Sequence, residues 1–167
     1  ITVKNLLQHK SGLRDCFADD GRFFADIKKH PNRDWNWRSI LEKYFKYNLH
    51  KKGLFKPAES FYYSDTNYLL LAILIEEITN KKYPEVLEER ILNPLSLNDT
   101  YLEFHQNKKG STPIIFPYHG TNSLKNVNTS FDWGCGGIVS STRDLNVFMR
   151  SLLTGQLFND IKTLKQM

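Results

Sequence analysis

The clearest hydrophobic pattern in the chain is a long apolar run in its middle. Residues 60–79 read SFYYSDTNYLLLAILIEEIT. Their apolar positions include Tyr68, Leu69, Ala72, Ile73 and Ile75. These positions lie on nearly every side of a helix, so the pattern predicts a helix of roughly 14 residues that is buried in the centre of a domain. We expect Asp65 or Thr66 to be its N-cap and Asn80 to lie just beyond its end.

Shorter helical patterns flank this run on both sides. The predicted helices begin near Val3, Ile40, Pro84 and Thr142, and they end before Gly12, before Gly53, near Leu92 and at Gly155. Proline suits the first turn of a helix, because the amide hydrogen that it lacks would have no partner there. Glycine suits the position after a helix, because it adopts the left-handed conformation without steric cost. The chain is therefore predicted to be mainly helical.

Polar stretches separate the predicted helices. Residues 13–34 show no regular period, and residues 106–134 are rich in Asn, Ser, Thr, Gly and Pro. Both stretches are expected to be loops, with one short strand at 114–116. The glycines of the segment 134–137 predict a tight turn. The predicted fold class is mainly α, with long loops and little or no sheet, in a single domain over residues 1–167.

The composition is that of an ordinary globular domain without a membrane span. Of the 167 residues, 40% are hydrophobic and 13% are aromatic, which is enough apolar material for a core. The longest apolar run, 69–75, is far shorter than the roughly 18 residues that a membrane span needs. The net charge of +5 comes from lysines scattered along the chain, as expected of a solvated surface. Nucleic acid is therefore not an expected partner.

Cysteine and histidine usage argues against a metal centre. The two cysteines, Cys16 and Cys135, cannot form a metal framework, and the five histidines show no paired ligand spacing. No metal and no other cofactor is therefore predicted. A disulfide between the two cysteines stays open at this point.

Three segments, and the polar loop between the last two, resemble one protein family when they are taken in order. Residues 1–13 read ITVKNLLQHKSGL, residues 61–102 read FYYSDTNYLLLAILIEEITNKKYPEVLEERILNPLSLNDTYL, and residues 134–155 read GCGGIVSSTRDLNVFMRSLLTG. Together they resemble the serine β-lactamase and penicillin-binding-protein superfamily, in its class C β-lactamase-like branch. That branch also holds DD-carboxypeptidases, D-aminopeptidases and esterases. The resemblance implies an acyl-serine hydrolase.

The resemblance implies three catalytic motifs, of which this chain holds one. In the family, a Ser-x-x-Lys lies upstream of the first segment, and a Lys-Thr-Gly or His-x-Gly lies downstream of the last. No serine here has a lysine three residues later, and Lys162-Thr163 is followed by Leu164. We therefore expect residues 1–167 to be the helical subdomain of the family's α/β fold, truncated at both ends. Its expected partner is the missing α/β part, without which it should be inactive.

The retained motif is Tyr63-Ser64-Asp65, which aligns with the family's Tyr-x-Asn. A serine hydroxyl needs a positioned base, and its leaving group needs a positioned acid. A phenol with a pKa of about 10 can do both only if nearby ammonium groups favour its anion. In the family those cations come from the two absent motifs. The resemblance thus implies a catalytic Tyr63, whereas composition alone would make it a tyrosine packed at a helix entrance.

Asp65 departs from the family pattern, in which asparagine stands at this position. Asparagine offers an N–H donor to a substrate carbonyl, whereas ionised aspartate only accepts, and its charge disfavours a tyrosinate. The resemblance implies a substrate-orienting Asp65, and Ser64 is expected to be structural. We expect the intact enzyme to be a poor β-lactamase that prefers ester or D-amino-acid substrates presenting a donor. Alignment with the Ser-Asp-Asn of class A β-lactamases is disfavoured because Thr66 replaces its asparagine.

The resemblance also bears on partners and location. The intact protein is expected to act on a small-molecule or peptide substrate and to be periplasmic or extracellular, as most family members are. An isolated subdomain would expose the surface that meets the α/β part, so self-association is expected. The alternative function is a non-catalytic binding or regulatory module on the same scaffold. The HKSG sequence at 9–12 is interpreted mainly as the end of a helix, although the family has a pocket-mouth loop there.

Overall fold

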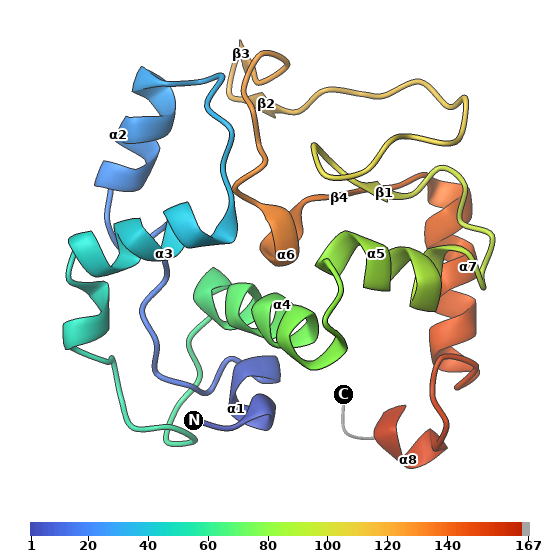
Figure 1. Ribbon diagram of the computed structural model, residues 1–167, viewed down its shortest axis with the longest axis horizontal. Helices are drawn as coiled ribbons and strands as arrows, with labels where there is room; N and C mark the ends of the chain where they lie inside the picture. Colours follow the sequence, from blue (N-terminus) through green and yellow to red (C-terminus); the bar gives the residue numbers. More distant parts are fainter. Residues whose placement is uncertain (165–167) are drawn as a thin grey trace.

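Helix α4 lies in the middle of the molecule, and other helices are arranged around it (Figure 1). The structure is a computed structural model that describes residues 1–164. Its α-helices are α1 (Val3–Leu7), α2 (Arg22–Lys29), α3 (Trp37–Lys46), α4 (Asp65–Thr79), α5 (Tyr83–Leu87), α6 (Trp133–Gly136), α7 (Thr142–Leu153) and α8 (Ile161–Leu164). A 3₁₀ turn, η1 (Leu49–Lys51), follows α3, and a π-helical turn, η2 (Glu88–Leu92), continues α5. The fold is mainly α, as predicted.

The described residues contain two pairs of very short strands. Strand β1 (Tyr101–Leu102) pairs antiparallel with β4 (Ile138–Val139), and β2 (Tyr118–His119) forms a hairpin with β3 (Asn122–Ser123). The strand predicted at 114–116 is wrong, because the hairpin begins two residues later. Two residues are too few to show a strand period, so only the pairing in space defines these strands.

Helix α4 buries one side and exposes the other. Leu69 and Ala72 lie in the core, whereas Ile78 near the C-terminal end is 80% exposed. The predicted burial on nearly every side is therefore wrong for the outer face of the last turns. Asn80 follows the last helical residue, as predicted, and adopts the left-handed conformation. The N-cap is Ser64, so the predicted cap at Asp65 or Thr66 is wrong.

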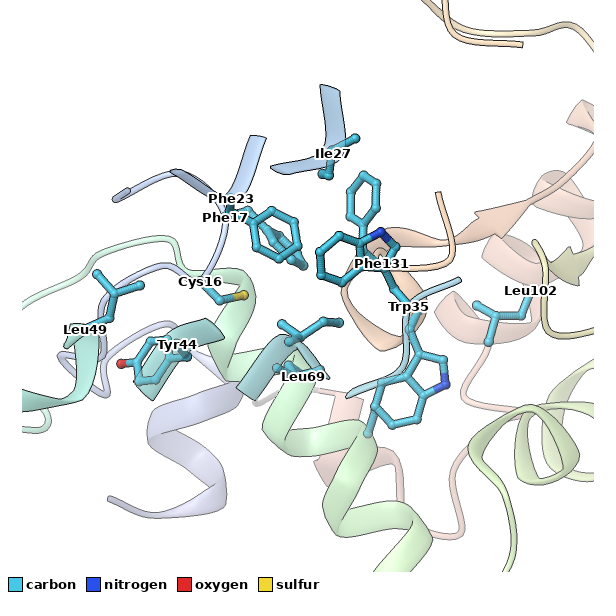
Figure 2. Packing of buried hydrophobic residues seen from close by; sticks show 13 residues of the cluster. Cys16, Phe17, Phe23, Ile27, Trp35, Tyr44, Leu49, Leu69, Leu102 and Phe131 are labelled. Atoms are coloured by element: carbon cyan, nitrogen blue, oxygen red, sulfur yellow. The ribbon is translucent and has the colours of Figure 1, made fainter. Parts of the chain in front are cut away.

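Aromatic side chains from distant segments form the core beside α4 (Figure 2). The ring centroid of Phe23 lies 4.8 Å from that of Phe17, 4.9 Å from that of Trp35 and 5.8 Å from that of Phe131. Burying one such side chain contributes about 1.5–3 kcal/mol to the free energy of folding. Phe23 and Ile27 are the buried positions of α2, a helix missing from the sequence prediction. Two positions four residues apart are too few to establish a helical period.

Both cysteines are free thiols. Cys16 is buried in the core, and the half-buried Cys135 donates from Sγ to the backbone carbonyl of Asp65 at 3.3 Å. The disulfide that the sequence left open is therefore not formed. Among residues 1–164, no group of three or more His, Cys, Asp or Glu side chains is arranged to hold a metal ion.

None of the helices in the described part of the chain is long and apolar enough to cross a lipid bilayer.

The segment predicted as a glycine turn forms the single helical turn α6, which packs directly against α4. A Cβ placed on Gly134 would lie 2.3 Å from the Cβ of Ala72. Real Cβ atoms do not approach so closely, so only glycine permits this contact between α6 and α4. Gly136, in the same turn, would place its Cβ in open space.

Gly134→Ala is expected to lower the free energy of unfolding by about 1–3 kcal/mol, because the added methyl group forces α6 away from α4. Urea denaturation followed by circular dichroism measures this loss. Gly136→Ala is the matched control, since its Cβ meets no atom within 4 Å. Equal destabilisation by the two substitutions would contradict the proposed steric cause.

Candidate active-site wall at the start of helix α4

The buried carboxylate of Asp15 holds the first turn of α4 in place. Its Oδ2 accepts a hydrogen bond from the backbone N–H of Asp65 at 2.5 Å. Its Oδ1 accepts from the backbone N–H groups of Phe17 and Ala18, at 2.7 and 2.6 Å. The first N–H groups of a helix have no partner within the helix, so an acceptor from elsewhere must supply one. Asp15, only 2% exposed, is that acceptor.

A second contact joins the same two segments. The backbone carbonyl of Arg14 accepts from the hydroxyl of Ser64 at 3.2 Å and from that of Thr66 at 2.8 Å. Both hydroxyl side chains are almost completely buried. Ser64 is therefore turned inward, which agrees with the structural role expected for it.

Tyr63 and Asp65 lie together at the helix start. The Tyr63 side chain is 58% exposed, and its hydroxyl donates to Oδ1 of Asp65 at 2.9 Å. The inward Ser64 between them leaves both side chains on the outer side of the turn. The Tyr63 ring packs against the ring of His9, with the centroids 4.6 Å apart. The structure thus brings the two sequence-predicted site residues into direct contact.

Comparison with known proteins identifies the family. The family described as Beta-lactamase matches residues 1–167. The chain belongs to this family. Its helical architecture is therefore that of a Beta-lactamase-family fold.

Solved structures of this family share the fold over nearly all of the chain. A D-stereospecific amidohydrolase from Streptomyces is 27% identical, with a TM-score of 0.83, and the match covers 99% of this chain and 50% of the amidohydrolase. The D-amino acid amidase from Ochrobactrum anthropi is 26% identical, with a TM-score of 0.75, over 98% of this chain and 46% of the amidase. The chain spans about half the length of these enzymes.

Among curated proteins, the teichoic acid D-alanine hydrolase of Staphylococcus aureus is 28% identical over 95% of this chain and 36% of that protein. A penicillin-binding protein of Bacillus subtilis is 34% identical over 60% of this chain and 21% of that protein. These two relatives are a bacterial hydrolase and a bacterial penicillin-binding protein, and each is considerably longer than the matched region.

The electrostatic environment of this family member keeps the Tyr63 phenol protonated. The hydrogen bond to Asp65 is the main cause that raises the pKa of Tyr63 to about 12, and desolvation by burial adds to it. Negative charge on Asp65 and Asp15 raises it further. Burial also raises the pKa of Asp65 itself. This direction matches the expectation that an aspartate here disfavours a tyrosinate.

The candidate wall is formed by His9, Asp15, Tyr63 and Asp65 at the start of α4. A further carboxyl group, that of Asp132, interacts with the charge of Asp65. Desolvation by burial, followed by the charges of Asp65 and Glu103, raises the pKa of Asp132 to about 6. Asp132 directly precedes α6, which packs against α4. The charge of Asp65, which lies far from Asp132 in the sequence, therefore disfavours the ionised form of Asp132.

Sequence reasoning found two residues of this wall and missed the others. Asp15 follows no motif that marks a helix anchor, and its partner lies 50 residues away, so no local signal identifies it. His9 lies in the HKSG sequence that was interpreted mainly as a helix end. That sequence also lies in the segment that carries the family resemblance, which is the signal that could have marked it.

Asp65→Asn is expected to lower the pKa of Tyr63 from about 12 towards the ordinary value of about 10, because it removes the carboxylate that accepts a hydrogen bond from the protonated phenol. Titration of tyrosine absorbance or of the Tyr63 NMR signals measures this change. Asp19→Asn is the matched control, since Asp19 raises the pKa of the neighbouring Tyr62 to about 12 by the same kind of hydrogen bond. A Tyr63 pKa that stays high in Asp65→Asn would refute the assignment.

Proposed function

We propose that this chain is the helical part of a serine hydrolase whose nucleophile lies in the rest of the intact enzyme. The observation that carries the proposal is the exposed Tyr63 hydroxyl at the start of α4, in the motif that aligns with the family's Tyr-x-Asn. The membership of the chain in the Beta-lactamase family supports it. The relatives of known structure are about twice as long, which leaves room for an α/β part.

In the proposed reaction, Tyr63 takes the proton of the nucleophilic serine and later returns a proton to the leaving group. Both steps require a phenol whose anion is accessible. The described residues disfavour this anion, because each group that shifts the pKa of Tyr63 raises it. Lysine ammonium groups from the Ser-x-x-Lys and Lys-Thr-Gly motifs of the intact enzyme would supply the opposing positive charge. Without them the chain is proposed to be inactive.

Asp65 is proposed to select substrates that carry a hydrogen-bond donor. A carboxylate can accept from the α-ammonium group of a D-aminoacyl substrate, whereas it repels the carbonyl oxygen that an asparagine amide would bind. Three relatives support this substrate class by their names: a D-stereospecific amidohydrolase, a D-amino acid amidase and a teichoic acid D-alanine hydrolase. The proposed reaction is hydrolysis of an amide or ester of a D-amino acid through an acyl-serine.

The exposed apolar face of helix α7 supports the proposal that another part of the intact enzyme packs against this chain. Leu145, Met149 and Leu153 are spaced four residues apart on one face and are 50%, 46% and 66% exposed. The same helix buries the polar Asp144 and Ser151 against the rest of the chain. A helix with its apolar stripe outward needs a partner surface. We propose the α/β part as that partner. Without it the apolar face of α7 stays exposed, and self-association of the chain alone therefore stays a prediction.

For the intact protein, a periplasmic or extracellular location is proposed.

Tyr63→Phe in the intact protein is expected to lower kcat for a D-alanine amide or ester by about 10²–10⁴-fold, because the group that transfers protons is lost. Steady-state kinetics measure the loss. Tyr62→Phe is the matched control, since it removes the neighbouring hydroxyl, which bonds to Asp19. Unchanged kcat in Tyr63→Phe, or an intact protein without Ser-x-x-Lys, would refute the catalytic proposal and favour a binding module on the same fold.

Asp65→Asn in the intact enzyme is expected to raise hydrolysis of a β-lactam relative to hydrolysis of a D-alanine ester. The amide provides a donor for the β-lactam carbonyl and removes the charge that binds the α-ammonium group. The ratio of the two kcat/KM values measures the change. A ratio that stays the same would contradict the proposed role of Asp65, while leaving that of Tyr63 untouched.

A further inference from the structure

His9 binds the backbone on both sides of Tyr63. Its carbonyl oxygen accepts from the N–H of Tyr62 at 3.0 Å, and its ring Nδ1 accepts from the N–H of Ser64 at 3.2 Å. The residues before and after Tyr63 are therefore both attached to one residue of the loop that follows α1. With both neighbours held, the Cα–Cβ direction of Tyr63 has little freedom.

The surrounding hydrogen bonds define the protonation of the His9 ring. A backbone N–H can only donate, so Nδ1, which receives the N–H of Ser64, carries no proton. The side-chain amide of Asn67 lies with its nitrogen 3.1 Å from the same Nδ1. A neutral imidazole with an unprotonated Nδ1 carries its proton on Nε2.

A second part of the network orients Asn67. The hydroxyl of Ser11 accepts from the N–H of Leu13 at 3.1 Å and donates to Oδ1 of Asn67 at 2.5 Å. Because Oδ1 is occupied in this way, the NH₂ group of Asn67 points to Nδ1 of His9. Asn67 and Ser11 are both almost completely buried, so the hydrogen bond between them is shielded from water.

The ring of His9 also supports the Tyr63 ring itself. The centroid of His9 is 4.6 Å from that of Tyr63 and 5.1 Å from that of Tyr68, with interplanar angles of 31° and 30°. His9 makes these contacts from a left-handed backbone conformation, with φ of 53°. This conformation is uncommon for residues other than glycine, although histidine, asparagine and aspartate adopt it more often than most.

We propose that His9 is a positioning residue for Tyr63, acting as a neutral Nε2–H imidazole that fixes the backbone and the ring of the tyrosine. This inference rests on the proposed function, because it assigns a residue that orients the same catalytic group. It adds a role to the HKSG sequence, which follows the end of α1 as expected: its histidine and its serine both bond to the start of α4. His9 acts through Tyr63 and has no proposed contact with substrate.

Two substitutions in the intact protein distinguish the two roles of the His9 side chain, as a hydrogen-bond acceptor and as an aromatic ring that packs on Tyr63. His9→Phe keeps an aromatic ring but leaves the N–H of Ser64 and the amide of Asn67 without an acceptor. His9→Asn loses the ring but places a side-chain oxygen near the position of Nδ1, and asparagine tolerates positive φ. His30→Asn, at the exposed C-terminal end of α2, is the matched control. Circular dichroism checks that each variant folds.

The expected result for His9→Phe is a fall in kcat of about 10–100-fold, with KM within about twofold, because a misplaced proton-transfer group slows chemistry without weakening binding. His9→Asn is expected to recover most of the lost kcat, and His30→Asn to leave it unchanged. Wild-type kcat in His9→Phe, alongside an inactive Tyr63→Phe, would overturn the role of His9 alone. Full activity of Tyr63→Phe would instead overturn the proposed function.

A measurement without turnover tests the same proposal if His9→Phe fails to fold. Nitrogen-15 NMR of the wild-type protein, labelled at histidine, reports which ring nitrogen carries the proton. We expect the Nε2–H tautomer of His9 at neutral pH and a slowly exchanging amide at Ser64. A proton on Nδ1 at neutral pH, in either a neutral or a doubly protonated ring, would overturn the proposal.

Discussion

The structure depends on one buried carboxylate, that of Asp15, which binds three backbone N–H groups at once. A carboxylate out of water is costly unless such donors surround it, and a helix start is costly unless an acceptor reaches it. Asp15 and the first turn of α4 satisfy each other, which joins the N-terminal loop to the central helix. Removing the carboxylate would leave these three N–H groups without their acceptor, and a fully buried donor without a partner costs about 1–3 kcal/mol. The direction in which α4 begins, and therefore the place of Tyr63, follows from this contact.

This anchor has an electrostatic consequence for the site. The same turn that bonds to Asp15 also carries Asp65, whose charge acts on Asp132 at the start of α6. The hydrogen bond to Asp65 and the charges of Asp65 and Asp15 raise the pKa of Tyr63 instead of lowering it. A hydrolase built on this wall needs positive charge from another part of the enzyme. That charge would both counter the carboxylates and make the tyrosinate accessible, so in the proposed enzyme the two halves would be coupled through charge as well as through apolar contact.

Much of the fold was predictable because a helix is marked in the sequence by a regular spacing of apolar residues and by its capping residues. The period of apolar residues located α4, and the left-handed Asn80 ended it where expected. The helix α2 and the strands β1 and β4 could not be predicted in this way, because each has too few buried positions to show a regular spacing. The candidate site divides in the same way. Tyr63 and Asp65 were found through a three-residue motif, whereas Asp15 and His9 act on partners about 50 residues away. A single sequence carries no sign of which distant N–H group a carboxylate or an imidazole will meet.

The order and spacing of residues were thus enough to establish a mainly helical chain, its resemblance to serine β-lactamases, and the presence of a tyrosine next to an aspartate where the family has asparagine. Only the three-dimensional arrangement decided that Ser64 turns inward, that the Tyr63 hydroxyl donates a hydrogen bond to Asp65, and that His9 holds the backbone on either side of the tyrosine. The physical reason is range. Helical periods and caps result from neighbours within about four residues, whereas hydrogen-bond partners and pKa shifts depend on groups that only folding brings together.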